Sequence, residues 1–172
     1  EKIAWTHFEK CCDENFSLSI TYKGIKEKYK INKKNFLNST EYFFNFLKEK
    51  KVLKDKKEIN VIGLRIVAPG KYFLEDKIID EKYLKELVKV KESAPLHIEP
   101  IIKEIEYLRK EFGESILIGI SDSKFHIDIL ECFRYYSIKK TDTEKYDIRR
   151  YGYHGISASS IIRKMKKKNE NI

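Results

Sequence analysis

The sequence has few of the residues and runs that mark disulfide-rich, metal-stapled or membrane proteins. Its three cysteines, Cys11, Cys12 and Cys132, provide neither a disulfide framework nor the four-ligand spacing of a zinc site, so we expect reduced thiols. No apolar run approaches the length of a membrane span, and the N-terminal residues lack the charged and apolar regions of a signal peptide. These absences predict a soluble cytoplasmic protein without a membrane partner.

What is present is the composition of a globular domain with an excess of positive charge. The 172 residues are 41% hydrophobic and 13% aromatic, which suffices for one domain with its own core, and we expect a single domain over residues 1–172. The formal net charge is +9, but bases and acids are interspersed along most of the chain. Only residues 163–168 form a dense basic cluster. We therefore favour a Lys-rich surface, and nucleic-acid binding through this cluster is the less favoured alternative.

Hydrophobic periodicity predicts an antiparallel start to the chain. Phe16, Leu18 and Ile20 alternate with hydroxyl side chains, which is typical of a strand with one buried face, and Gly24 marks a turn. We expect two or three antiparallel strands within residues 1–32 and alternating helices and strands over residues 33–172. This order predicts an α/β fold in which helices cover a mixed sheet.

Caps and apolar spacing place the later elements. Asn38 is a candidate cap for the first helix, and Asp80 for a second helix that buries Tyr83, Leu84, Leu87 and Val88. The expected elements are helices over residues 39–50, from Asp80 to Pro95 and from Ile98 to Gly113, strands over residues 59–67 and 116–120, and a polar surface loop over residues 139–147.

Two glycines flank a histidine in the segment Arg-Arg-Tyr-Gly-Tyr-His-Gly-Ile-Ser, residues 149–157. We interpret Ser157 as the N-cap of a following helix. This arrangement directs the His154 imidazole and the backbone N–H groups around Gly155 at one point, which suits a phosphate or carboxylate oxygen. The alternative is a capped turn with one hydrogen-bonded histidine.

An acid follows the most apolar run of the sequence. Residues 116–120 read as a strand buried on both faces, and Asp122 comes directly after its end. Because ligands of open α/β sheets bind at the carboxyl ends of strands, Asp122 is a second candidate site residue.

Four segments in order resemble motifs of the acetate kinase family. They read GLRIVAPG from Gly63, APLHIE from Ala94, SDSKFH from Ser121 and RRYGYHGIS from Arg149. The resemblance implies the ribonuclease H-like fold shared by acetate and sugar kinases, Hsp70 and actin. It implies most of the first domain of such a kinase without its opening strand, and a possible homodimer.

The resemblance also implies a reaction and its residues. ATP would transfer its γ-phosphoryl group, with Mg²⁺, to a short-chain carboxylate, giving an acyl phosphate and ADP. Catalytic roles would fall on Asp122 and His154, and Arg65 and His97 would bind the substrate. The phosphate site would comprise His154, Gly155 and Ser157, and we assign no metal ligand within this chain. An isolated chain is expected to be inactive, because phosphoryl transfer requires donor, metal and acceptor to be held together.

Several residues depart from the family motifs and support another reading. The departures remove polar groups or add bulk at Ala68, Pro69, Ile98, Glu99, Lys124, Ile156 and Ala158. A degenerate binding or assembly module of the same fold is therefore the alternative. Arg65 could be a paired strand arginine, His97 a helix-start residue and His126 a core histidine, and we favour that last role for His126. If the kinase reading is right, the side chains of Arg65, Asp122 and His154 face one cleft at one sheet edge.

Overall fold

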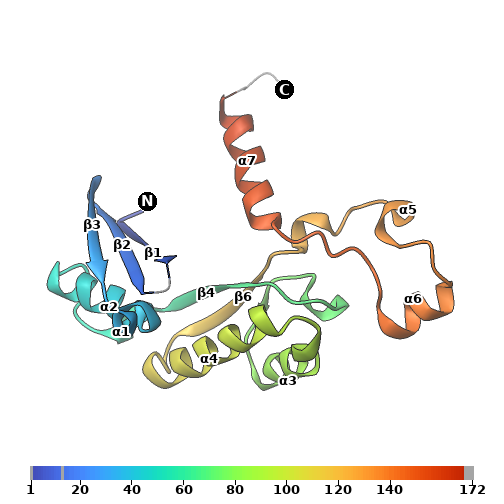
Figure 1. Cartoon of the computed structure of the whole chain (residues 1–172), viewed down its shortest axis with the longest axis horizontal. Coiled ribbons are helices and arrows are strands. Elements are labelled where there is room, and N and C mark those ends of the chain that lie inside the picture. Colours follow the sequence, from blue (N-terminus) through green and yellow to red (C-terminus); the bar gives the residue numbers. More distant parts are fainter. Residues whose placement is uncertain (1, 13, 169–172) are drawn as a thin grey trace. The chain divides into compact units, whose positions relative to one another are not determined.

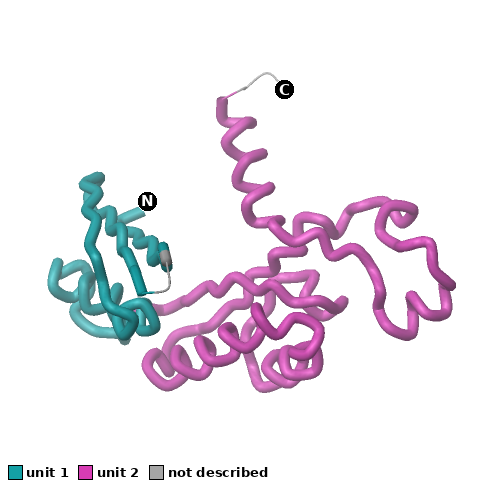
Figure 2. The backbone as a smooth tube through the Cα atoms, in the orientation of Figure 1, with its two compact units in different colours: residues 1–58 teal, residues 59–172 magenta. Residues whose placement is uncertain are grey.

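The chain folds as two compact units in the computed structural model, which describes residues 2–12 and 14–168. Unit 1 comprises residues 1–58 and unit 2 residues 59–172; Figure 2 draws them in teal and magenta. Each contains a three-stranded sheet. The single domain expected over residues 1–172 stays a prediction.

Unit 1 begins with an antiparallel meander (Figure 1). Its strands are β1 (Ala4–Cys12), β2 (Asn15–Tyr22) and β3 (Ile25–Ile31), with β2 in the centre. Lys23 and Gly24 connect β2 to β3 with φ values of 49° and 82°. Positive φ is accessible to glycine without steric cost, which explains Gly24 in this tight turn.

The alternation of β2 produces the core of unit 1. Phe16, Leu18 and Ile20 are at most 6% exposed, while the residues between them are half-buried. Two helices, α1 (Lys33–Leu37) and α2 (Ser39–Glu49), supply aromatic rings to this core, and a short 3-10 helix, η1 (Lys56–Glu58), follows. The Phe16 and Phe36 ring centroids, for example, lie 4.9 Å apart. Asn38 directly precedes α2, but its side chain makes no capping hydrogen bond.

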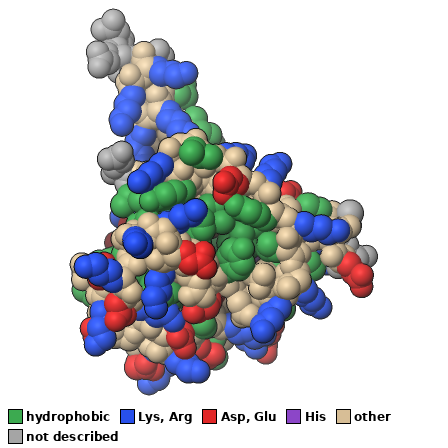
Figure 3. All heavy atoms as spheres, turned by 90° about the vertical axis from the view of Figure 1, so that its left-hand side faces the viewer, with side chains coloured by type: hydrophobic (Ala, Val, Ile, Leu, Met, Phe, Trp, Pro, Cys, Tyr) green, Lys and Arg blue, Asp and Glu red, His purple; other side chains and the backbone are tan. Residues whose placement is uncertain are grey.

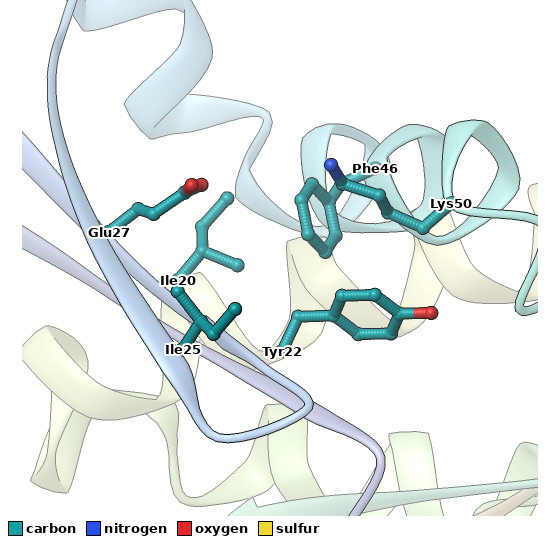
Figure 4. A pocket seen from close by; sticks show the side chains of 6 residues that line it. All are labelled: Ile20, Tyr22, Ile25, Glu27, Phe46 and Lys50. Atoms are coloured by element: carbon teal, nitrogen blue, oxygen red, sulfur yellow. The ribbon is translucent and has the colours of Figure 1, made fainter.

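A small pocket opens beside this core (Figure 4). Its volume is about 100 Å³, and it is lined by Ile20, Tyr22, Ile25, Glu27, Phe46 and Lys50. The Lys50 ammonium lies 5.6 Å from the centroid of the Phe46 ring. Because ligand pockets usually measure several hundred Å³, this one is too small for a metabolite.

Unit 2 contains the mixed sheet that the sequence predicts. Its order is β4 (Val61–Ile66), β6 (Ile116–Ser121), β5 (Lys77–Ile78). The β4 and β6 strands are parallel, and the two-residue β5 runs antiparallel to β6. In β6, Leu117, Gly119 and Ser121 are buried while Ile118 and Ile120 are only half-buried. The prediction of a strand buried on both faces is therefore wrong for one face.

Helices α3 (Glu81–Lys89) and α4 (Pro95–Glu111) build the core of unit 2, joined by the 3-10 helix η3 (Lys91–Ser93). The Asp80 side chain accepts a 2.7 Å hydrogen bond from the Tyr83 N–H, as expected of an N-cap. Tyr83 is 1% exposed, and its ring lies 5.4 Å from that of Phe73 in the 3-10 helix η2 (Lys71–Phe73). Val88, predicted to point inward, is 58% exposed instead.

The segment after β6 differs most from the sequence expectation. It forms the 3-10 helix η4 (Lys124–His126) and the helices α5 (Glu131–Arg134), α6 (Lys140–Tyr146) and α7 (Gly155–Lys168). Residues 139–147 are mostly exposed, as predicted, but the prediction of a loop is wrong, because α6 occupies most of the segment. Ser157 is the third residue of α7 rather than its N-cap.

Charged side chains of both signs are scattered among hydrophobic ones over the face drawn in Figure 3. On that face the basic side chains do not gather into one continuous field. Among the described residues, no helix combines the length and apolar character required to cross a membrane.

Candidate active site

Parallel pairing brings Arg65 and Asp122 to the same edge of the unit 2 sheet. Arg65 is paired with Ile120, and Asp122 follows the last paired residue of β6. The Asp122 N–H donates to the Ile66 carbonyl at 3.1 Å, which continues the ladder past the strand end. The Arg65 Nη2 then reaches the Asp122 Oδ2 at 2.7 Å. The predicted meeting of these two residues is thus a direct consequence of the β4–β6 register.

Asp122 also joins the sheet to the glycine loop. Its side chain is 1% exposed, and its Oδ2 accepts a 2.6 Å hydrogen bond from the His154 N–H. The Ile156 N–H points to Oδ1 at 3.4 Å, and the Gly155 N–H donates to the Asp122 carbonyl at 2.8 Å. Asp122 therefore accepts hydrogen bonds from the first free N–H groups of α7, although it lies in a distant segment. Its negative charge also interacts favourably with the positive end of the helix dipole.

These contacts determine the charge states of the pair. Burial alone would raise the pKa of the Asp122 carboxyl, but hydrogen bonds from Arg65, His154 and Ile156, with the Arg65 charge, lower that pKa overall. The hydrogen bond to Asp122 raises the pKa of Arg65. The pair is therefore an ionised carboxylate against a permanent cation.

Three consecutive left-handed residues shape the loop before α7. The φ angles are 80° at Gly152 and 53° at both Tyr153 and His154. Such angles are unfavourable for side chains larger than glycine, and strain of this kind concentrates at functional sites. In this conformation the His154 N–H points to Asp122 while the His154 residue is exposed.

The glycines of the loop permit close approach to β6 and η4. A Cβ on Gly155 would lie 2.5 Å from the Asp122 carbonyl oxygen, and one on Gly152 would lie 2.2 Å from the His126 Cδ2. Neither contact is compatible with a side chain at its glycine position. The two glycines let the loop close onto the Asp122 backbone and the His126 ring.

His126 has a contact that the sequence did not reveal. Its ring is half-buried, and its Nε2 lies 2.7 Å from the Tyr153 carbonyl oxygen. The sequence alone favours a core histidine without a site role. No local pattern could have identified this contact, because the two residues are 27 positions apart.

A second set of hydrogen bonds supports the end of β6. The Asp76 Oδ1 accepts from the Ser121 N–H at 2.9 Å, and its Oδ2 pairs with the Lys124 Nζ at 2.7 Å. The Ser121 hydroxyl donates to the Phe73 carbonyl. An open hollow of about 660 Å³ lies beside these groups; its lining includes Asp76, Ile120, Lys124, Gly155, Ile156 and Arg163. Lys124, a departure from the family motif, thus fixes the strand end and borders open space.

Two predicted site residues lie apart from this network. His97 is exposed in the first turn of α4, and its N–H donates to the Ala94 carbonyl. Ser157 is exposed on α7. None of the hydrogen bonds found among the described residues connects either side chain to Arg65 or Asp122.

The donor set does not form a resident metal site. Within residues 2–12 and 14–168, no three His, Cys, Asp or Glu side chains gather as ligands for an ion. Both Asp122 carboxylate oxygens already face Arg65 or backbone N–H donors. A hard cation such as Mg²⁺ requires several free oxygen ligands, which this edge does not offer by itself.

Comparisons with known proteins agree on one family. A family model described as "Acetokinase family" matches residues 3–171. The acetate kinase of Mycoplasma genitalium is 31% identical over 156 residues, which cover 91% of this chain and 39% of that protein. The acetate kinase of Thermoanaerobacter pseudethanolicus is 35% identical over 136 residues, covering 77% of this chain and 34% of that protein.

Solved structures give the same result for the fold. A propionate kinase from Francisella tularensis superposes with a TM-score of 0.80 and 25% identity, over 97% of this chain and 42% of that one. The acetate kinase of Porphyromonas gingivalis has a TM-score of 0.74 and 24% identity, over 92% of this chain and 42% of that one. This likeness confirms the predicted fold class. The chain spans about two fifths of the length of these relatives.

Proposed function

Because this chain belongs to the acetokinase family, we propose that it forms one side of an active site that phosphorylates a short-chain carboxylate. The γ-phosphoryl group of ATP would pass to the carboxylate, giving an acyl phosphate and ADP. The observation that carries the proposal is the Arg65–Asp122 pair joined to the His154 loop at one sheet edge. The names of the similar proteins, acetate kinase and propionate kinase, support short carboxylic acids as acceptors.

Arg65 is the proposed carboxylate-binding residue. Its Nη2 is held by Asp122, which fixes the plane of the guanidinium, while 54% of the side chain remains exposed. The remaining N–H donors can hold a substrate carboxylate through two parallel hydrogen bonds. In this role Asp122 orients the arginine and stays ionised, because its pKa is lowered.

His154 is the proposed contact to the phosphoryl group in transfer. Negative charge spreads over the equatorial oxygens in that transition state, and a positioned donor stabilises it. The exposed His154 imidazole and Ser157 hydroxyl are available for phosphate. Gly155 would contribute through its lack of a side chain, since its N–H donates to Asp122. His97 is a proposed substrate contact on α4.

ATP and Mg²⁺ are the cofactors that the family implies. Bound Mg²⁺ would neutralise phosphate charge, but the described residues alone do not provide its ligands. The contribution of this chain is therefore positioning of the acceptor and of the phosphoryl oxygens. We propose that residues 1–172 alone have negligible activity. The cytoplasmic location and the homodimer remain predictions.

A hydroxylamine trap tests the function. The full-length protein that contains this chain is incubated with ATP, Mg²⁺ and acetate, propionate or butyrate, and the acyl hydroxamate is measured. We expect product with at least one acid, and a loss of about a hundredfold in kcat/KM for Arg65→Gln and for His154→Ala. Lys89→Ala, an exposed change on α3, is the control. Absence of hydroxamate with every acid, from folded protein, would overturn the kinase proposal in favour of the assembly module.

A further inference from the structure

One peptide group of the glycine loop is held at both of its ends. The Tyr153 carbonyl oxygen lies 2.7 Å from the His126 Nε2, and the His154 N–H, in the same peptide plane, donates to the Asp122 Oδ2 at 2.6 Å. The two anchors come from η4 and from the end of β6. The peptide between residues 153 and 154 therefore bridges His126 and Asp122.

Packing makes this arrangement specific. A Cβ on Gly152 would lie 2.2 Å from the His126 Cδ2 and 2.4 Å from its Cγ. Tyr153 and His154 both have φ values of 53°, which residues other than glycine seldom adopt. The strained conformation persists because the surroundings hold both of its polar ends.

The partners determine which nitrogen of His126 carries a proton. A carbonyl oxygen only accepts hydrogen bonds, so Nε2 must be the donor. A hydrogen bond to the C=O of a peptide polarises its N–H and strengthens the bond that this N–H donates. The Asp122 Oδ2 receives that bond together with the one from Arg65. His126 is thus linked to Arg65 through the peptide and the carboxylate.

We propose that His126 is a positioning residue, which acts through the 153–154 peptide to fix the Asp122 carboxylate and the direction of the His154 side chain. Only the role given to His154 in this inference rests on the proposed phosphoryl transfer. The contacts themselves require neither substrate nor nucleotide.

The test uses nuclear magnetic resonance on residues 1–172 and three variants. In His126→Leu we expect the titration midpoint of the Asp122 carboxyl to rise by about 0.5 pH unit, because the hydrogen bond from the His154 N–H is weakened. For the same reason the resonance of the His154 amide proton should shift upfield. Gly152→Ala displaces the ring from the other side and should move both signals in the same direction. His126→Gln retains an amide donor at the reach of Nε2 and should restore both signals.

The controls separate positioning from general destabilisation. His7→Leu removes an exposed histidine on β1 and should leave both signals unchanged. Unchanged Asp122 and His154 signals in a folded His126→Leu chain would overturn the proposal. So would a His126→Gln chain that behaves like His126→Leu, since ring packing would then be the cause.

A measurement on the unaltered chain covers the case in which the variants do not fold. Long-range proton–nitrogen spectra should show a protonated Nε2 on His126. A neutral ring protonated only at Nδ1 would overturn the inference. Because no assay here involves phosphoryl transfer, the result is independent of the hydroxamate experiment.

Discussion

The sheets of the two units bury different kinds of residue. In unit 1 the central strand β2 places Phe16, Leu18 and Ile20 against helices, and its buried positions are apolar. In unit 2 the end of β6 buries Ser121, Asp122 and Ser123 in succession. Among the described residues, these three and Thr143 are the buried polar side chains, and all belong to unit 2.

The apolar core of unit 1 stabilises the fold directly, whereas the buried polar residues of unit 2 cost stability and belong to the candidate site. Burying a polar group costs free energy unless every hydrogen-bonding atom finds a partner, so a sheet edge that buries three of them in a row requires a network around it. Arg65, Asp76 and the N-terminus of α7 supply that network. The central strand of unit 1 buries no polar residue fully: Ser17 and Ser19 are half-buried, and so is Thr21, although the Thr21 hydroxyl oxygen itself is buried without a partner.

The largest expected effect on stability comes from a substitution in the apolar core of unit 1. Leu18→Ala should destabilise unit 1 by about 3 kcal/mol, because Leu18 is 0% exposed and its removal leaves a cavity. Fluorescence of Trp5, the one tryptophan of the chain, reports denaturant unfolding of this unit. Ser19→Ala, on the other face of β2, should change stability by less than about 0.5 kcal/mol. Equal losses for both variants would contradict the one-sided core.

The second largest effect comes from a substitution among the buried polar residues of unit 2. Asp122→Ala should destabilise unit 2 by about 2 kcal/mol, because it leaves Arg65 and the N–H groups of His154 and Ile156 without their acceptor. Hydrogen exchange of the β6 amides measures this loss, and the Trp5 transition should stay in place. Asp128→Ala, at an exposed position nearby, is the matched control. A shift of the Trp5 transition in Asp122→Ala would show that the two units unfold together.

A smaller effect follows from the charge alone. Because the folded-state pKa of Asp122 is lowered, its ionised form stabilises unit 2 fully above the unfolded pKa of ~3.9, and this stability is lost as the pH falls through the folded pKa. The difference in β6 amide protection between the original chain and Asp122→Asn should therefore shrink in acid. The pKa of Asp76 is also lowered, but Asp76 is present in both chains, so its contribution to the pH dependence cancels in this difference. A difference that is constant with pH would contradict the assignment.

The smallest expected effect is at the exposed ion pair. Lys124 and Asp76 are 55% and 31% exposed, so Lys124→Ala should cost unit 2 less than about 1 kcal/mol, and less still at high salt. Lys89→Ala, which breaks the exposed Lys89–Glu86 pair, is the reference. Chemical denaturation at two salt concentrations measures both. A salt-independent loss well above that of Lys89→Ala would mean that Lys124 holds the strand end through more than its charge.

Local patterns were sufficient wherever one face of an element is apolar. The alternation of β2 and the capped stripe of α3 predict their elements because burial and sequence period agree. The two-residue β5 and the polar α6 have no hydrophobic periodicity, so neither could be predicted from the sequence. The start of α7 at Gly155 was missed for another reason. Its capping acceptor, Asp122, lies on a different element, and a local search finds only the nearby Ser157.

Some contacts of the candidate site could likewise be predicted from the sequence, and others could not. Arg65 and Asp122 could be brought together from sequence because Arg65 lies near the end of one apolar strand and Asp122 directly after another, and parallel strands end at one edge. The contact of His126 with the Tyr153 carbonyl could not, because it depends on two successive left-handed residues that are not glycine. Sequence pattern gives no warning of such backbone angles.

The register of β4 with β6 has a consequence for the order of folding. Neighbouring strands in unit 1 are joined by short turns, whereas Arg65 and Asp122 are 57 positions apart. Closing a long loop costs entropy before any contact compensates, so pairings between distant segments form late. On a ribosome, the meander of unit 1 can fold while β6 is still unsynthesised. The strand β4, which carries Arg65, then remains unpaired until β6 and Asp122 have left the exit tunnel.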